Sequence, residues 1–141
     1  MINIHFLQVS SFLLFFNYMK LGNKRNKNSY EKLIQISIGL TFVSSLLFWN
    51  NPIKYSFFHM FDLINVAILS ALVLFYHFYG RVNISKSKYT ISAILVNIIS
   101  FFAYKSRYYS LIRNDWLSDN HLYYHFILHL FGNLSIYHFL N

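Results

Sequence analysis

Five long apolar runs constrain what this chain can fold into. They cover residues 2–19, 33–49, 60–80, 89–104 and 121–140. A helix of about 20 residues spans a hydrocarbon core of roughly 30 Å. Because lipid offers no partners to backbone N–H and C=O groups, runs of this length predict helices. The second and fourth runs are short, so we expect their helices to extend into the flanking residues.

The composition agrees with a membrane protein rather than a soluble one. Only 11% of the 141 residues are charged and 56% are hydrophobic, whereas a soluble domain has about 25% charged residues. The first run lacks the basic start and the cleavage site of a signal peptide, which predicts a retained helix. No internal repeat or long linker divides the chain. We therefore expect one all-α domain over residues 1–141, a multi-pass transmembrane bundle of about five helices; the sequence does not indicate which membrane.

The net charge of +8 lies in the connections between the apolar runs. No basic helical face is present, so the charge does not indicate nucleic-acid binding. The first connection holds five basic residues against one acidic residue, Glu31. Together the first and third connections, the latter including Arg81, hold eight basic residues, and the second and fourth hold four. This bias predicts that the first and third connections are cytoplasmic, which places the N-terminus outside and the C-terminus inside.

The last run carries His121, His125 and His129, spaced four residues apart. Such residues share one face of a helix, and lipid disfavours a polar stripe unless it faces protein, water or a metal. If all five runs span, the end of the second run and the starts of the third and fifth lie on one side. That side then also collects polar and aromatic residues from the second and third runs: Ser44, Ser45, Phe48, Trp49, His59 and Asp62. Asp62 is the acidic residue that we place nearest the interior of an apolar run.

Two interpretations of this group stay open. Imidazoles and a carboxylate are suitable zinc ligands, and a zinc-bound water near neutral pKa could attack an ester or amide. A neighbouring carboxylate or serine would orient the water or a ligand. Alternatively, Asp62 caps its helix, and the histidines form hydrogen bonds with neighbouring helices. The first interpretation predicts a membrane-embedded hydrolase that acts on a lipid, and the second predicts polar packing.

Three motifs around these residues resemble the CREST superfamily of membrane hydrolases and receptors, which includes alkaline ceramidases, progestin and adipoQ receptors, and myomaker-like proteins. YYHFILHLFG resembles its final His-x-x-x-His motif, at His125 and His129. HMFDLINVAILSA resembles its aspartate motif, at Asp62, and VSSLLFWNNP resembles its Ser-x-x-x-His motif, at Ser44. The resemblance implies a zinc-dependent lipid amidase or esterase, in which the histidines hold the metal and Asp62 and Ser44 are catalytic.

The chain departs from the family pattern at one decisive position. Phe48 stands where the family has the histidine that would be the third zinc ligand. The resemblance then implies that His59 or His121 replaces this ligand, or that the site binds no zinc and is inactive. The chain also has fewer apolar runs than family members usually have. The similarity covers roughly residues 41–72 and 119–133, under half of the chain.

The sequence thus predicts two functions from different classes. The first is a CREST-like zinc hydrolase with a degenerate metal site and a membrane lipid as substrate. The second is a non-catalytic subunit of a larger membrane complex, for example an organellar respiratory assembly, with partner membrane subunits and no metal. A channel or transporter is less favoured, because one polar stripe does not define a path across the bilayer.

The fourth run carries small and polar residues at a spacing of three or four: Thr90, Ala93, Asn97 and Ser100. This spacing is typical of a helix–helix contact face in membranes.

Overall fold

The computed structural model describes residues 4–80 and 85–141 and consists of five α-helices. They are α1 (Ile4–Gly22), α2 (Ser29–Asn50), α3 (Phe57–Tyr79), α4 (Lys86–Arg107) and α5 (Asp119–Leu140), with one turn of π-helix, η1 (Tyr108–Ile112), directly after α4. The predicted all-α fold of about five helices is confirmed. The second and fourth runs extend into their flanks, as expected. Residues 2–3 of the first predicted run and Arg81 lie outside the described residues.

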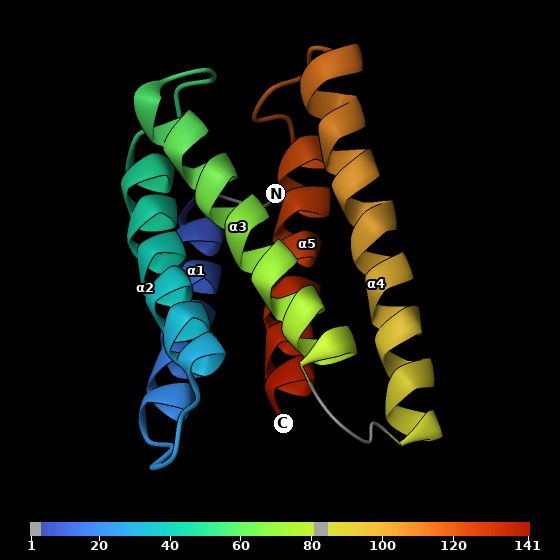
Figure 1. Cartoon of the computed structure of the whole chain (residues 1–141). Coiled ribbons are helices and arrows are strands. Elements are labelled where there is room, and N and C mark those ends of the chain that lie inside the picture. The colour runs from blue at the N-terminus through green and yellow to red at the C-terminus, as the bar shows by residue number, and fades with distance from the viewer. Residues whose placement is uncertain (1–3, 81–84) are drawn as a thin grey trace.

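Successive helices run in opposite directions along one bundle (Figure 1). The end of α2 and the starts of α3 and α5 therefore lie at the same end, which we call the upper end after its place in Figure 1. Helix α2 packs against α1 and α3, and α5 contacts α1, α3 and α4. The Cα atoms of α3 and α4 nowhere approach within 8 Å in the described residues.

Polar capping residues fix where four of the helices begin. Asn28, Ser56, Ser85 and Ser118 each accept a hydrogen bond from the backbone N–H three residues later. A side-chain acceptor at this position satisfies one of the free N–H groups of the first turn and contributes about 1 kcal/mol to helix stability. The helix starts therefore follow from local chemistry that the sequence contains.

Three helical stretches are long and apolar enough to cross a membrane: α2, α3 and the continuous stretch Lys86–Ile112. Most of their large apolar side chains are exposed on the outside of the bundle. Helices α1 and α5 do not belong to this group, and both carry several polar side chains, among them Asn17 in α1 and the histidines of α5. That α1 and α5 also cross the membrane stays a prediction.

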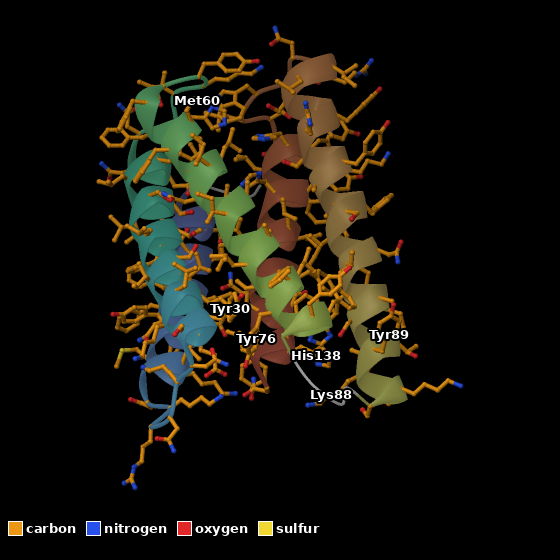
Figure 2. All side chains as sticks on the ribbon, viewed as in Figure 1. Tyr30, Met60, Tyr76, Lys88, Tyr89 and His138 are labelled. Atoms are coloured by element: carbon orange, nitrogen blue, oxygen red, sulfur yellow. The ribbon has the colours of Figure 1, made fainter. Side chains whose placement is uncertain are left out.

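The lower end of the bundle is held by a buried carboxylate, near Tyr76 in Figure 2. The Tyr76 hydroxyl donates to Glu31 Oε1 at 2.5 Å, and Lys24 Nζ forms an ion pair with the same oxygen at 2.5 Å. The backbone N–H of Asn28 donates to Glu31 Oε2 at 3.2 Å, which completes the capping box of α2. Glu31 is only 1% exposed. Glu31 therefore joins α2 to α3, although its position in the sequence predicts a charge in the first connection.

Candidate functional site

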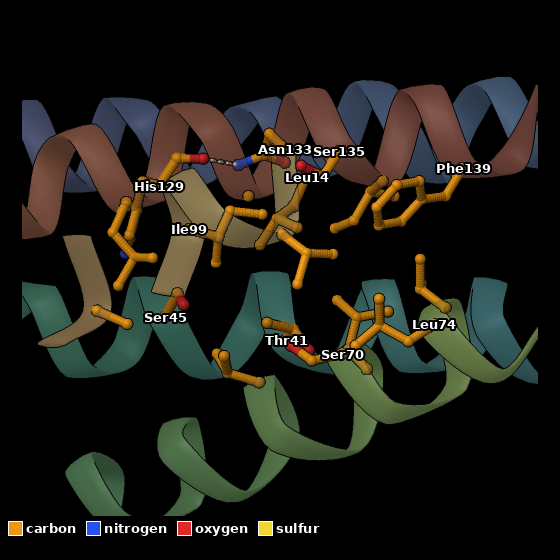
Figure 3. Close-up of a pocket in the computed structure, with 18 of the residues that line it drawn as sticks. Leu14, Thr41, Ser45, Ser70, Leu74, Ile99, His129, Asn133, Ser135 and Phe139 are labelled. Atoms are coloured by element: carbon orange, nitrogen blue, oxygen red, sulfur yellow. Dashed lines mark hydrogen bonds between the residues drawn. The ribbon is translucent and has the colours of Figure 1, made fainter. Parts of the chain in front are cut away.

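A cavity of about 350 Å³ lies inside the bundle, and all five helices contribute to its wall (Figure 3). Most of its lining is apolar, from residues such as Leu69, Val73 and Ile99. Four residues of the predicted upper group also line it: Ser45, Asp62, His125 and His129. Helices α2, α3 and α5 thus bring one hydroxyl, one carboxylate and two imidazoles to the same internal space.

Asp62 is held by two serines of the neighbouring helix. The hydroxyls of Ser45 and Ser44 donate to Asp62 Oδ1 at 2.6 Å and 2.8 Å. The shorter distance is typical of a hydroxyl that donates to a carboxylate. Asp62 Oδ2 forms no hydrogen bond to any described residue, although only 6% of the side chain is exposed. The carboxyl group therefore keeps one acceptor oxygen for a ligand in the cavity.

His129 is oriented by a serine of α1. Its Nδ1 lies 2.9 Å from Ser10 Oγ, and the Ser10 hydroxyl itself donates to the carbonyl of Leu7 at 2.9 Å. The hydroxyl proton is thus used, so the hydrogen-bond network assigns the imidazole proton to Nδ1, which donates to Ser10 Oγ. Nε2 of His129 then keeps its lone pair and can accept a hydrogen bond.

His125 has a similar partner on α4. Its Nδ1 lies 2.9 Å from Ser106 Oγ, and its ring lies 4.9 Å from that of His129, centroid to centroid. Trp49 is fully buried, and its ring packs edge-on against both imidazoles, at 5.0 Å and 6.2 Å. The two imidazoles that line the cavity are therefore each fixed by a serine and by one shared indole.

His59 and His121 have a different role, because both close the first turn of a helix. His59 Nδ1 accepts the backbone N–H of Tyr55 at 2.9 Å, and His121 Nδ1 accepts that of Leu117 at 3.3 Å. In each case the residue three positions earlier is the capping serine, and the donor residue has a left-handed φ of 62°. The arrangement is a variant of the capping box, in which histidine stands in the place of glutamate and accepts the N–H of the residue before the capping serine. The same local motif thus begins both α3 and α5.

This capping role does not fit metal binding. A neutral imidazole carries one proton, and an Nδ1 that accepts a backbone N–H leaves that proton on Nε2. Nε2 then has no lone pair for a metal, whereas a metal-bound histidine normally donates from its other ring nitrogen. Neither His59 nor His121 lines the cavity. His59 and His121 thus differ in role from His125 and His129, although the rings of His121 and His125 lie only 5.6 Å apart.

No described residue stands in for the predicted third zinc ligand. Phe48 is buried and stacks on the ring of His59 at 4.9 Å. Within residues 4–80 and 85–141, no group of three His, Cys, Asp or Glu side chains is placed to hold a metal ion. The residues present do not fit zinc, and we derive no step through it. Metal analysis of the purified protein is the direct test of the zinc prediction.

The cavity is bordered by α3 and α4, whose Cα atoms stay more than 8 Å apart in the described residues. At the lower end their side chains meet, where Ser92 Oγ lies 2.7 Å from His77 Nε2 and the rings of Phe78 and Tyr89 lie 5.6 Å apart. Above this contact, both helices line the cavity, and some lining residues are also exposed: Leu63, Val66 and Ser70 of α3 and Ser100 of α4. The cavity therefore opens sideways, toward the region that lipid would occupy.

Sequence reasoning missed three residues of the site. Ser10 and Ser106 orient the two cavity histidines, but a single serine in an apolar run gives no signal of its partner. Gly132 lines the cavity, and a Cβ added there would meet no heavy atom within 4 Å. A glycine inside a long helical run is a weak signal of such a feature.

Comparison with family models, curated proteins and solved structures finds no match to this chain. The resemblance to the CREST superfamily therefore rests on the three motifs alone, and it stays a prediction.

Proposed function

We propose that this chain is a multi-pass membrane protein that binds a membrane lipid in its interior cavity. The observation that supports the proposal is the cavity itself, with its apolar wall, its side opening between α3 and α4, and its polar upper part. Small-molecule sites are typically 300–1,000 Å³ in volume, mainly apolar, with a few convergent polar groups. An acyl chain would lie along Leu69, Val73 and Ile99, and its polar end would meet Asp62 and His129.

The polar groups favour a particular class of lipid. Asp62 Oδ2 and His129 Nε2 are both acceptors, so the bound group should donate hydrogen bonds. None of the lining residues is Lys or Arg, and a phosphate without a paired cation would be costly to bury. We therefore propose a lipid whose polar end carries hydroxyl or amino groups rather than phosphate.

The proposal stops at binding. The CREST resemblance implies hydrolysis of a lipid amide or ester, but the present residues do not fit the zinc ion on which that chemistry depends. The second predicted function, a non-catalytic subunit of a larger complex, needs no lipid in the cavity and predicts partner chains that co-purify. The same experiment separates the two.

The test uses two photo-cross-linking probes with the same single acyl chain, one a monoacylglycerol and the other a lysophosphatidic acid. The purified chain is reconstituted in phosphatidylcholine vesicles, illuminated with each probe, digested and sequenced by mass spectrometry. We expect the monoacylglycerol to label peptides of α3, α4 and α5 that line the cavity, at least several-fold more than the lysophosphatidic acid. Released fatty acid and bound metal are measured in the same samples.

One matched pair of variants and one single variant locate the probe. Ala103 lines the cavity and Ala71 lies on the exposed outside of α3, so Ala103→Leu should reduce labelling while Ala71→Leu should not. Asp62→Asn keeps Oδ1 for both serines but replaces Oδ2 with a donor, so it should weaken labelling without unfolding the bundle. Equal labelling in Ala103→Leu and Ala71→Leu, or equal labelling by both probes, would refute the proposal. Absent labelling together with stoichiometric partner chains would favour the subunit.

A further inference from the structure

Asn97 occupies the middle of α4 and is exposed on the outside of the bundle. It lies nine residues from Lys88 and eight from Lys105, the lysines that mark the two ends of the apolar stretch. At 1.5 Å per residue, these lysines are each roughly 13 Å away along the helix axis. If α4 crosses the membrane, as the proposed function requires, this amide lies near the bilayer midplane.

Asn97 faces away from the rest of the chain. Helix α4 buries Ser92, Leu95 and Ser106; within the described residues its backbone packs against α5, and its lower end meets α3 through side chains. At 100° per residue, Asn97 lies on the side of α4 opposite this contact. Thr90 shares that outer side and half-buried Ala93 lies at its edge, whereas Ser100, the fourth residue of the predicted contact face, lines the cavity. The outer side of α4 packs against no other helix of the described residues. Figure 1 shows the same arrangement, with α4 at the edge of the bundle.

The Asn97 amide is only partly satisfied. Its Nδ2 donates to the carbonyl of Ala93 in its own helix at 2.8 Å. Its Oδ1 accepts no hydrogen bond from any residue that the structure describes, and its second N–H has no acceptor there. A polar group without partners is costly in hydrocarbon, where water cannot replace them. The outer side of α4 therefore has an unpaired acceptor and an unpaired donor at the same point.

We propose that two copies of this chain pack together through the outer side of α4, with Asn97 pairing across a twofold axis. An amide is self-complementary, because the free N–H of one copy can donate to the free Oδ1 of the other, and the reverse pair forms by symmetry. Thr90, Ile94 and Phe101 are exposed on the same side of α4, so a second copy packed there would also contact apolar side chains. No charged residue lies on α4 between Lys88 and Lys105, so no like charges oppose each other there.

The absence of cysteine makes this proposal directly testable. Ala93→Cys places a single thiol on the proposed face, and Ile91→Cys places one on another exposed side of α4. Both full-length variants are reconstituted in phosphatidylcholine vesicles at several protein-to-lipid ratios and oxidised with copper phenanthroline. We expect Ala93→Cys to form a covalent dimer at low protein density, at least tenfold more efficiently than Ile91→Cys.

Asn97→Leu is then added to Ala93→Cys, and Asn97→Gln serves as the variant that keeps an amide. Loss of two interhelical hydrogen bonds should reduce cross-linking about tenfold or more, and Asn97→Gln should retain part of it. Circular dichroism confirms that the helices persist. Equal cross-linking at positions 93 and 91, no effect of Asn97→Leu, or a cross-link to a chain of different mass would each overturn the proposal.

A failure of the dimer is distinguishable from a failure of the membrane assignment. If α4 crosses the bilayer, Ala93→Cys should resist a water-soluble maleimide in intact vesicles and react with it after detergent is added. Resistance without cross-linking would refute the dimer alone. Reaction in intact vesicles would refute the crossing of α4, and with it the reason for pairing Asn97.

Discussion

The two serines that hold Asp62 should contribute unequally to stability. Ser45 Oγ lies 2.6 Å from Asp62 Oδ1 and has no other acceptor among the described residues, whereas Ser44 Oγ divides its proton between Asp62 at 2.8 Å and the Thr41 carbonyl at 3.1 Å. A hydrogen bond to a charged group contributes about 1.5–3 kcal/mol, and a shared, weaker one about 0.5–1.5 kcal/mol. We therefore expect Ser45→Ala to cost about 2 kcal/mol and Ser44→Ala about 1 kcal/mol.

The double variant should cost more than the sum of the two. With either serine present the carboxyl group retains one donor, but with neither it is a buried acceptor without a partner, which costs about 3–5 kcal/mol. The free energy of unfolding is measured by reversible titration of mixed micelles with dodecyl sulfate, followed by the fluorescence of Trp49 and Trp116. Ser70→Ala is the control, because Ser70 also lines the cavity but forms no hydrogen bond within the described chain.

Equal effects of Ser44→Ala and Ser45→Ala would refute the argument from the shared proton. If the double variant loses no more than about 3 kcal/mol of unfolding free energy, the two single losses are additive. Water or another group would then replace the serines at Asp62. The reasoning about a buried carboxylate would then fail, and with it the argument that Asp62 Oδ2 is reserved for a ligand.

Residues outside the Asp62 cluster should also contribute to stability. His121→Ala should destabilise the protein by about 1 kcal/mol and speed amide exchange at Leu117, whereas His121→Gln should restore both, because glutamine can accept the same N–H but is not a zinc ligand. Gly132→Ala should raise the free energy of unfolding by about 0.5–1 kcal/mol, because a Cβ there meets no heavy atom within 4 Å and alanine favours helix; a loss of stability would contradict the open space at Gly132. Tyr76→Phe should cost about 1.5 kcal/mol in the same titration, because it removes a 2.5 Å hydrogen bond to buried Glu31, and an unchanged midpoint would contradict that role.

The helices were predictable because their signals are local. Apolar runs long enough to span lipid leave no alternative to helix, and the serines at positions 56, 85 and 118 explain where three of the helices begin. The antiparallel order of the runs also placed Asp62 and the histidines of α5 at one end. The buried position of Glu31 was not predictable. A carboxylate close to the start of an apolar run gives the same sequence pattern whether it is solvated or accepts a hydrogen bond from a tyrosine 45 residues later.

The site was only partly predictable, because four histidines of equal appearance have two different roles. His59 and His121 each stand three residues after a serine, so the signal for capping was present as Ser-x-x-His. The partners of His125 and His129 lie 19 and 119 residues away in sequence. No spacing rule connects such residues, and only the packing of α1 and α4 against α5 reveals them.

Polar contacts inside this bundle have a role that apolar contacts cannot have in lipid. Hydrocarbon solvates a leucine as well as another helix does, so helix association in a bilayer depends on close packing and on interhelical hydrogen bonds. Neighbouring helices here are joined in this way: Asn17 to Asn133 between α1 and α5, Ser45 to Asp62 between α2 and α3, Ser92 to His77 between α3 and α4, and Ser106 to His125 between α4 and α5. These pairs fix the register of the helices. Asn97, in the middle of α4, forms no hydrogen bond with another helix of the described chain, and the same physical rule that assembles the bundle therefore predicts a second bundle beside it.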